Sequence, residues 1–303
     1  MLPNLFIVGA AKAGTTSLHA LLGRHPAAYM SEPKEPRFFA YEGERAEAFG
    51  GPGARDLINS IVKTRAEYEQ LFVGVTDERV VGESSPAYLY SPIAAARIRE
   101  AIPDARIVVV LRDPADRAYS HWVDNVGSGW EPVHDFARVL DLAEERRREN
   151  WWRKWDYVGH GFYAAQLKRY LDRFPADQIK VLLFEDMLGE HPAGVEDLCE
   201  FLDLDPALLE RQELPRANIG GVPRSRTLTA VLSRSNPIRS SLRLVLPSGI
   251  RARARRALVR RNTTKPPLDP DTRARLQELY RGDVRELEAL IDRDLSHWLR
   301  PSN

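Results

Sequence analysis

The sequence of 303 residues contains one cysteine, Cys199, and no long hydrophobic run. A single cysteine excludes an internal disulfide and a zinc site built on cysteines, and it favours a cytoplasmic location. The longest apolar runs, Leu5–Ala11 and Ile107–Leu111, are too short to span a bilayer. Because Met1–Asn4 carries no basic side chain, we also expect no signal peptide.

Lysine is scarce throughout the chain, and acidic residues are absent from one long segment. Only seven of the 44 basic residues are lysines, so Lys12 and Lys34 stand out in an arginine-rich sequence. No Asp or Glu occurs from Arg216 to Leu268, where twelve arginines and one lysine are found. The net charge of the whole chain is only +1, which gives no reason to expect a nucleic-acid partner.

Five short runs of aliphatic and β-branched residues predict the strands of one sheet. Their apolar character is continuous rather than alternating, which is typical of strands covered on both faces in a parallel sheet. The runs are Leu5–Val8, Ala28–Met30, Val80–Val81, Ile107–Leu111 and Ile179–Phe184. Helical patterns lie between them, at Thr15–Leu22, Pro92–Ala101 and Tyr163–Phe174. This alternation predicts a single α/β domain over residues 1–303, with a doubly wound, mainly parallel sheet flanked by helices.

The arginine-rich part of the C-terminal third is not compatible with one long helix. Residues 224–261 contain Pro237, Pro247 and Gly249, which interrupt a continuous helix. We predict short helices or a variable basic flap over about residues 223–264. Its arginines and leucines suit contact with an anionic membrane surface or an acidic substrate, and a soluble flap is the alternative. From Leu276 to Leu299 the helical pattern returns and predicts a helix that packs on the sheet.

A glycine-containing loop joins the first predicted strand to the first predicted helix. The spacing Gly9-x4-Gly14-Thr15-Thr16 resembles a Walker A loop, whose backbone N–H groups bind anions at the start of a helix. The two threonines are also suited to cap that helix. However, Thr15 stands where nucleoside triphosphatases have a lysine, and Lys12 lies in the middle of the loop instead. We therefore predict an anion-binding, P-loop-like turn, the alternative being a tight turn with an exposed lysine.

A second candidate phosphate site follows the strand Ile107–Leu111. Arg112 is expected at the carboxyl end of this strand and Ser120 two turns into the following helix. A guanidinium and a hydroxyl placed in this way can converge on one phosphate. Two alternatives stay open: Asp113 holds Mg²⁺ as in a Walker B strand, or it caps the helix beside surface-exposed Arg112 and Arg117.

With both motifs in this order, the sequence resembles the sulfotransferases that use 3′-phosphoadenosine-5′-phosphosulfate (PAPS). It is most similar to the branch that contains the heparan-sulfate sulfotransferases and their bacterial relatives. Lys12–Leu18 resembles the 5′-phosphosulfate loop of the family, and Arg112–Ser120 resembles its 3′-phosphate site. Other stretches follow in the family's order, namely Leu22–Pro26, Glu35–Phe39, Glu83–Tyr88, Tyr163–Tyr170 and Gly282–Trp298. The resemblance is weakest between Pro223 and Thr264.

The resemblance implies which residues hold the donor. The 5′-phosphosulfate would be held by Lys12, Ala13, Gly14, Thr15, Thr16 and Ser17. Arg112 and Ser120 would hold the 3′-phosphate, which distinguishes PAPS from ATP. Lys12 would touch the bridging oxygen, where negative charge grows as the sulfuryl group leaves, and would therefore stabilise the transition state. No metal is expected to be required.

The resemblance also implies a general base for the acceptor. Glu35, just before the Phe38-Phe39 pair, matches the glutamate that takes this role in the heparan-sulfate branch. Partial burial beside the two phenylalanines should raise its pKa and suit it to the task near neutral pH. A loop carboxylate paired with Lys34 or Arg37 is the alternative, and Glu32 is a competing base. Arg37 stands where that branch often has histidine, which suggests a different acceptor environment, such as one for an anionic substrate.

Several other residues are candidates for acceptor or donor contacts. Glu83 and Ser84 are expected to face the same cleft, although the related glycan enzymes often carry lysine at the position of Ser84. Trp155, in a cluster with two other tryptophans, would line the acceptor pocket or form part of the aromatic core. Arg224 and Arg226 would clamp the 3′-phosphate or the acceptor, or else belong to a solvated basic face.

Two other functions stay open from the sequence. A P-loop kinase for nucleosides or small molecules would bind ATP with Mg²⁺, but Thr15 contradicts the lysine that it needs after Gly14. A non-catalytic nucleotide- or polyanion-binding protein would use the basic segment, but it would not need both phosphate motifs and Glu35. The sequence therefore favours an enzyme, a PAPS-dependent sulfotransferase. Its acceptor would be a small molecule, a lipid or a carbohydrate that offers a hydroxyl group or, less readily, an amine.

Overall fold

A computed structural model describes residues 1–43, 48–188, 193–209, 222–223, 263–264 and 266–300. Arg224 and Arg226, with almost all of the predicted basic flap, lie outside the described residues. The domain bounds 1–303 and the flap bounds 223–264 therefore stay predictions.

The centre of the fold is a five-stranded sheet in which all neighbouring strands are parallel. Its strands are β1 (Leu5–Gly9), β2 (Ala28–Met30), β3 (Val80–Ser84), β4 (Arg106–Leu111) and β5 (Ile179–Leu183), in the order β2-β3-β1-β4-β5. Every residue of β1 and β3 is buried, because the sheet is covered on both faces. Each of the five predicted strands is confirmed, and β3 extends three residues beyond the predicted pair.

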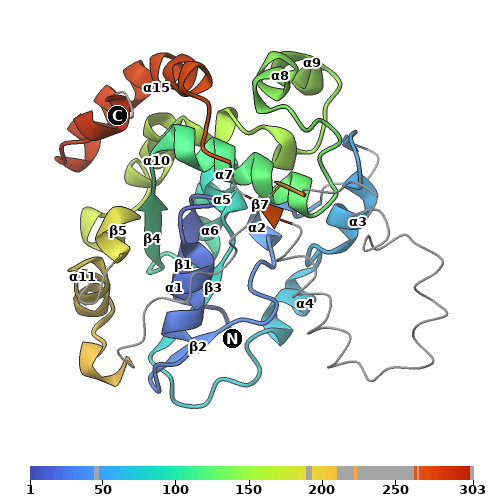
Figure 1. Cartoon of the computed structure of the whole chain (residues 1–303). Coiled ribbons are helices and arrows are strands. Elements are labelled where there is room, and N and C mark those ends of the chain that lie inside the picture. Colours follow the sequence, from blue (N-terminus) through green and yellow to red (C-terminus); the bar gives the residue numbers. More distant parts are fainter. Residues whose placement is uncertain (44–47, 189–192, 210–221, 224–262, 265, 301–303) are drawn as a thin grey trace.

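Helices flank the sheet as expected for a doubly wound α/β domain (Figure 1). The α-helices are α1 (Thr15–Leu22), α2 (Phe38–Tyr41), α3 (Ala54–Asn59), α4 (Arg65–Gln70), α5 (Ala87–Tyr90), α6 (Ala94–Ala101), α7 (Pro114–Gly127), α8 (Phe136–Asp141), α9 (Ala143–Arg148), α10 (Tyr163–Leu171), α11 (Ala193–Leu202) and α15 (Pro270–Ile291). Short 3₁₀ helices occur at Arg153–Trp155, Gly159–Gly161, Ala176–Gln178, Glu185–Met187, Pro206–Leu208 and Ser296–Leu299. Within the described part of the chain, no helix combines the length and apolarity that crossing a bilayer requires.

The C-terminal helix α15 differs from its prediction in extent and in contacts. It begins at Pro270, six residues before the expected start, because the Asp269 side chain accepts the Thr272 N–H and caps the helix. The helix lies against α10 and α7 rather than directly on the sheet (Figure 1). Arg273 completes this docking through ion pairs with Asp113, at 3.3 Å, and with Asp116.

A small two-stranded ladder lies apart from the main sheet. Its strands β6 (Val222–Pro223) and β7 (Thr263–Thr264) are antiparallel, so the two ends of the predicted flap lie side by side. β6 is close to α7, and the Tyr119 hydroxyl of α7 donates to the Pro266 carbonyl at 2.9 Å. The base of the flap is therefore fixed next to α7.

Candidate functional site

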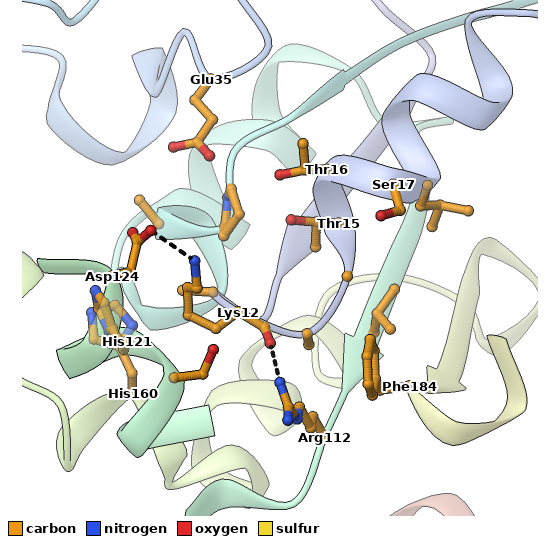
Figure 2. Close-up of a pocket in the computed structure, with 18 of the residues that line it drawn as sticks. Lys12, Thr15, Thr16, Ser17, Glu35, Arg112, His121, Asp124, His160 and Phe184 are labelled. Carbon is orange, nitrogen blue, oxygen red and sulfur yellow. Dashed lines mark hydrogen bonds and ion pairs between the residues drawn. The ribbon is translucent and has the colours of Figure 1, made fainter. Parts of the chain in front are cut away.

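A cavity of about 540 Å³ opens at the carboxyl ends of the parallel strands. The residues that follow β1, β3, β4 and β5 all contribute to its lining, which is where doubly wound folds place ligands. From the predicted site, the structure brings Lys12, Ala13, Gly14, Thr15, Thr16, Ser17, Glu35, Arg37, Arg112 and Ser120 to this cavity. The residues of both phosphate motifs thus surround one space (Figure 2).

The loop after β1 turns α1 so that its N-terminus faces the cavity. Gly14 occupies the N-cap position with φ 92°, and no side chain caps the helix, so the predicted capping by the threonines is wrong. A Cβ at Gly14 would lie 3.1 Å from the Phe184 ring, which together with the positive φ favours glycine there. The Ser17 N–H donates to the Gly14 carbonyl at 3.0 Å, and Thr15, Thr16 and Ser17 line the cavity at the start of the helix, where N–H groups favour an anion.

Lys12 points its ammonium group into the cavity (Figure 2). Its Nζ lies 3.3 Å from Asp124 Oδ1 of α7, and its side chain is 17% exposed. The alternative of an exposed loop lysine is therefore wrong. The Lys12 carbonyl accepts a hydrogen bond of 3.2 Å from Arg112 Nη1, so the two motifs are in direct contact although they lie 100 residues apart.

Arg112 and Ser120 share the second side of the cavity. The Arg112 guanidinium lies 4.7 Å from the centre of the Phe184 ring, which holds it at the end of β4. Arg117 does not join them. It is completely buried and contacts His121 Nδ1 at 3.3 Å, so it is not the surface residue that one alternative assumed.

Asp113 does not line the cavity. Its Oδ1 caps α7 by accepting the N–H groups of Ala115 and Asp116 at 2.8 and 3.0 Å, and its Oδ2 pairs with Arg273. The capping alternative is therefore correct for this residue. No group of three or more His, Cys, Asp or Glu side chains is arranged to hold a metal ion within the described ranges.

Glu35 lies on the opposite wall and is held between two cations. Its Oε1 is 3.1 Å from Lys34 Nζ, and its Oε2 is 2.6 Å from Arg37 Nη2. Burial raises the pKa of Glu35, but the charges and hydrogen bonds of Lys34 and Arg37 outweigh burial and bring the pKa to about 2. The expected rise in pKa is therefore wrong, and Glu35 is ion-paired with both Lys34 and Arg37, while its role as general base stays a prediction. Lys34 Nζ also donates to Thr15 Oγ1 at 3.3 Å and so joins this wall to the loop.

Glu83 and Ser84 do not reach the cavity, which corrects the prediction for both. Strand β3 continues through them, and both side chains are completely buried. Ser84 Oγ lies 3.1 Å from His19 Nδ1. Burial raises the pKa of Glu83 to about 7, although three hydroxyl groups that donate to its carboxylate act in the opposite direction.

Trp152, rather than Trp155, lines the cavity. Its ring stacks on Tyr41 with 4.4 Å between the ring centres. Trp155 is buried and packs edge-on against Trp151 at 6.0 Å, so it belongs to the core. The sequence identified the cluster but gave no signal for which tryptophan faces inward.

Sequence reasoning missed other charged and aromatic lining residues. Asp124 lies one helical turn after Ser120 on α7, a spacing that would have indicated it. Phe184 ends the predicted strand Ile179–Phe184, a position that would also have indicated it, whereas Lys154 carries no comparable signal. Burial lowers the pKa of Lys154, an effect that Asp124 partly offsets. His121 also lines the cavity, and burial lowers its pKa well below the usual value.

The sheet, the loop with its unusual lysine and the shared cavity define an α/β protein with a P-loop-like turn at its cavity. The chain belongs to the sulfotransferase family, whose model matches residues 3–207. This confirms the resemblance found in the motifs.

Individual relatives agree with the family. The bifunctional heparan sulfate N-deacetylase/N-sulfotransferase 2 of Bos taurus is 29% identical over 220 residues, which cover 68% of this chain and 22% of that protein. The Homo sapiens protein of the same name is 28% identical with the same coverage. The chain thus spans about a fifth of the length of these relatives. The crystal structure of a sulfotransferase from Alicyclobacillus acidocaldarius is similar over 99% of this chain and 100% of that one, with 35% identity and a TM-score of 0.76.

Proposed function

We propose that this protein transfers a sulfuryl group from PAPS to a hydroxyl or amine acceptor. The contact between the Lys12 carbonyl and Arg112 is the observation that carries the proposal, because it joins the two phosphate motifs across one cavity. A donor with phosphates at both its 5′ and 3′ positions needs two such cation-bearing sites within the length of one nucleotide. Membership of the sulfotransferase family supports the same donor.

The residues present suit this donor. The N-terminus of α1 offers N–H groups and hydroxyls to the 5′-phosphosulfate, and Arg112 with Ser120 offers a guanidinium and a hydroxyl to the 3′-phosphate. Phe184 and Leu188 provide an apolar wall for the adenine ring of the donor. The cavity volume of about 540 Å³ is in the usual range for ligand sites. Contact of Arg224 and Arg226 with the 3′-phosphate or the acceptor stays a prediction, because both residues lie outside the described part of the chain.

Lys12 stabilises the leaving phosphate in this proposal. When bound, PAPS supplies the sulfuryl group, and the broken bond leaves its negative charge on the 5′-phosphate. The ammonium group of Lys12 attracts that charge more strongly as it grows, which lowers the barrier rather than only tightening binding. To do so it must exchange Asp124 for the phosphate oxygen.

Glu35 accepts the proton that the acceptor loses as it attacks. Its pKa of about 2 keeps the carboxylate ionised throughout the physiological pH range, so the base form is always present. The two cations that lower the pKa also reduce basicity, so the driving force for proton transfer is smaller than for a base with a pKa near 7.

We propose a carbohydrate as the first acceptor class to test. The stacked rings of Tyr41 and Trp152 suit the apolar face of a sugar, and Arg37 with Lys154 suits an anionic substituent. The names of the Bos taurus and Homo sapiens relatives point to heparan sulfate as their substrate. Small-molecule and lipid acceptors belong in the same screen with labelled PAPS, beside N-deacetylated heparosan. Contact of residues 224–261 with an anionic membrane or substrate, and a cytoplasmic location, stay predictions.

Calorimetry with the product 3′-phosphoadenosine-5′-phosphate (PAP) and with ATP–Mg²⁺ tests the donor. We expect PAP to bind at least tenfold more tightly, and Arg112→Ala to remove most of that preference. Arg106→Ala is the matched control, because Arg106 starts the same strand and pairs with Asp203 away from the cavity. A preference for ATP–Mg²⁺ would instead indicate a kinase and end the proposal. Binding of neither nucleotide, or equal binding of both, would also contradict it.

A further inference from the structure

Glu83 is a completely buried carboxyl group for which the proposed reaction has no direct use. Its Oε1 accepts hydrogen bonds from the Tyr68 and Tyr88 hydroxyls at 2.8 and 2.6 Å, and its Oε2 accepts one from Ser85 Oγ at 2.6 Å. Burying a carboxylate costs free energy unless its oxygens accept hydrogen bonds, and these three donors provide them. Two of the donors also make a second contact.

The second contacts lead to the segment that carries Glu35. Ser85 Oγ accepts the backbone N–H of Arg37 at 3.0 Å, and the Tyr88 hydroxyl accepts the backbone N–H of Phe39 at 3.4 Å. A hydroxyl has one hydrogen, so donating it to Glu83 leaves the oxygen lone pairs directed at the N–H groups. Glu83 therefore sets the orientation of both hydroxyls toward this segment.

Arg37 needs such support because of its backbone conformation. Its φ of 58° lies in the left-handed region, which is unfavourable for residues other than glycine. In this conformation its guanidinium donates two hydrogen bonds to Glu35 Oε2, from Nη2 at 2.6 Å and from Nε at 3.2 Å. A continuous chain of hydrogen bonds thus runs from Glu83 through Ser85 and Arg37 to Glu35.

We propose that Glu83 is a positioning residue for the Glu35–Arg37 pair and acts through the hydroxyls of Ser85 and Tyr88. This inference rests on the proposed function, because it takes Glu35 as the base. Tyr68 provides the matched control. Its hydroxyl donates to the same carboxylate oxygen as that of Tyr88, but among the described hydrogen bonds it accepts no backbone N–H.

The test follows the titration of Glu35 by NMR in protein labelled with ¹³C at the glutamate carboxyl groups. The Glu35 signal is assigned by its loss in Glu35→Gln. Lys34 and Arg37 contact Glu35, and His19, Glu83 and Lys154 are the other charged or titratable groups that act on it. Wild type and Tyr68→Phe should show no Glu35 titration between pH 8 and 4. Glu83→Gln, Ser85→Ala and Tyr88→Phe should raise the Glu35 pKa by about one unit, so that at pH 4 about a tenth of the Glu35 carboxyl groups are protonated, against about a hundredth in wild type and Tyr68→Phe.

The size of the effects should follow the geometry. Ser85→Ala should raise the Glu35 pKa more than Tyr88→Phe does. Ser85 accepts the N–H of Arg37 itself at 3.0 Å, whereas Tyr88 accepts the N–H of Phe39 at 3.4 Å. The proposal is overturned if the three variants titrate as Tyr68→Phe does. Should Glu83→Gln not fold, Ser85→Ala against Tyr68→Phe decides the question. PAP affinity is measured in parallel: if wild type does not bind PAP, the donor proposal fails, whereas the Glu35 titration still decides the positioning role.

Discussion

Several charged side chains of the cavity form ion pairs, and this pairing governs what those residues can do. Lys12 contacts Asp124, and Glu35 lies between Lys34 and Arg37. Each of these pairs must rearrange or loosen when phosphate or acceptor groups enter. The effect of replacing one of these residues therefore depends on the ion-pair partner that loses its counter-charge.

Replacement of Asp124 should strengthen product binding. In Asp124→Asn the Lys12 ammonium no longer has a carboxylate that competes with the 5′-phosphate of PAP. A partly exposed ion pair contributes up to about 1 kcal/mol, so we expect the Kd for PAP to fall about two- to fivefold in calorimetry. Asp141→Asn is the control, because Asp141 pairs with Arg275 on the surface. Weaker binding in Asp124→Asn would instead show that Asp124 holds Lys12 in its productive position.

Replacement of Glu35 should separate catalysis from donor binding. We expect Glu35→Gln to lower turnover more than about a hundredfold, the usual scale for a general base, while PAP affinity changes less than about twofold. Turnover is measured with labelled PAPS and the acceptor that the screen identifies. Glu32→Gln, which changes an exposed carboxylate three residues earlier, should have turnover near wild type. Full activity in Glu35→Gln together with a loss in Glu32→Gln would move the base to Glu32.

At the scale of elements, α15 fixes the start of α7 and thereby the second phosphate motif. Arg273 reaches from α15 to Asp113 and Asp116, and its side chain is only 14% exposed. Removing one partner of a largely buried ion pair leaves the other charges unsatisfied. The position of Arg112 and Ser120 thus depends on a helix that is distant in sequence.

Arg273→Ala should therefore reduce both stability and product binding. We expect a loss of about 2 kcal/mol in the free energy of unfolding and a Kd for PAP that rises severalfold. Arg275→Ala removes a surface pair of the same helix and should change both quantities little. Urea denaturation and calorimetry provide the measurements. Equal effects of the two variants would contradict the docking role of Arg273.

The elements themselves were largely predictable, because their signals are local. The run Ile107–Leu111 is apolar throughout and forms β4, and α1 has the predicted bounds Thr15–Leu22. The error at its N-cap has a physical cause. A left-handed glycine satisfies the turn without a side-chain cap, and the sequence allowed both Gly14 and the threonines to play that part.

For the whole molecule, the burial of Glu83 should be visible in the pH dependence of stability. Its pKa is raised from 4.5 to about 7, so the folded state binds this proton more tightly than the unfolded state. The resulting stability is complete below pH 4.5 and is lost as the pH rises through 7. Glu83→Gln lacks this dependence.

Urea unfolding at pH 5 and pH 8 tests this expectation. The destabilisation by Glu83→Gln should be larger at pH 5 than at pH 8, by about 2 kcal/mol. Burial lowers the pKa values of His19 and His160 to about 4, so these histidines reduce the free energy of unfolding as the pH falls below 6.5. Both are present in wild type and in Glu83→Gln, so their contributions cancel when the two proteins are compared. A destabilisation that is the same at both pH values would show that Glu83 does not titrate in this range.

The sequence by itself determined the strands of the parallel sheet and the P-loop-like turn with Lys12. These features depend on residues close together in the chain, whose hydrophobic pattern and spacing limit the local geometry. Only the tertiary structure decided the charge state of Glu35, the burial of Glu83 and the choice of Trp152 over Trp155 for the cavity wall. Burial and electrostatic environment are set by segments that meet in space from distant parts of the chain, and no local pattern records which of them will meet.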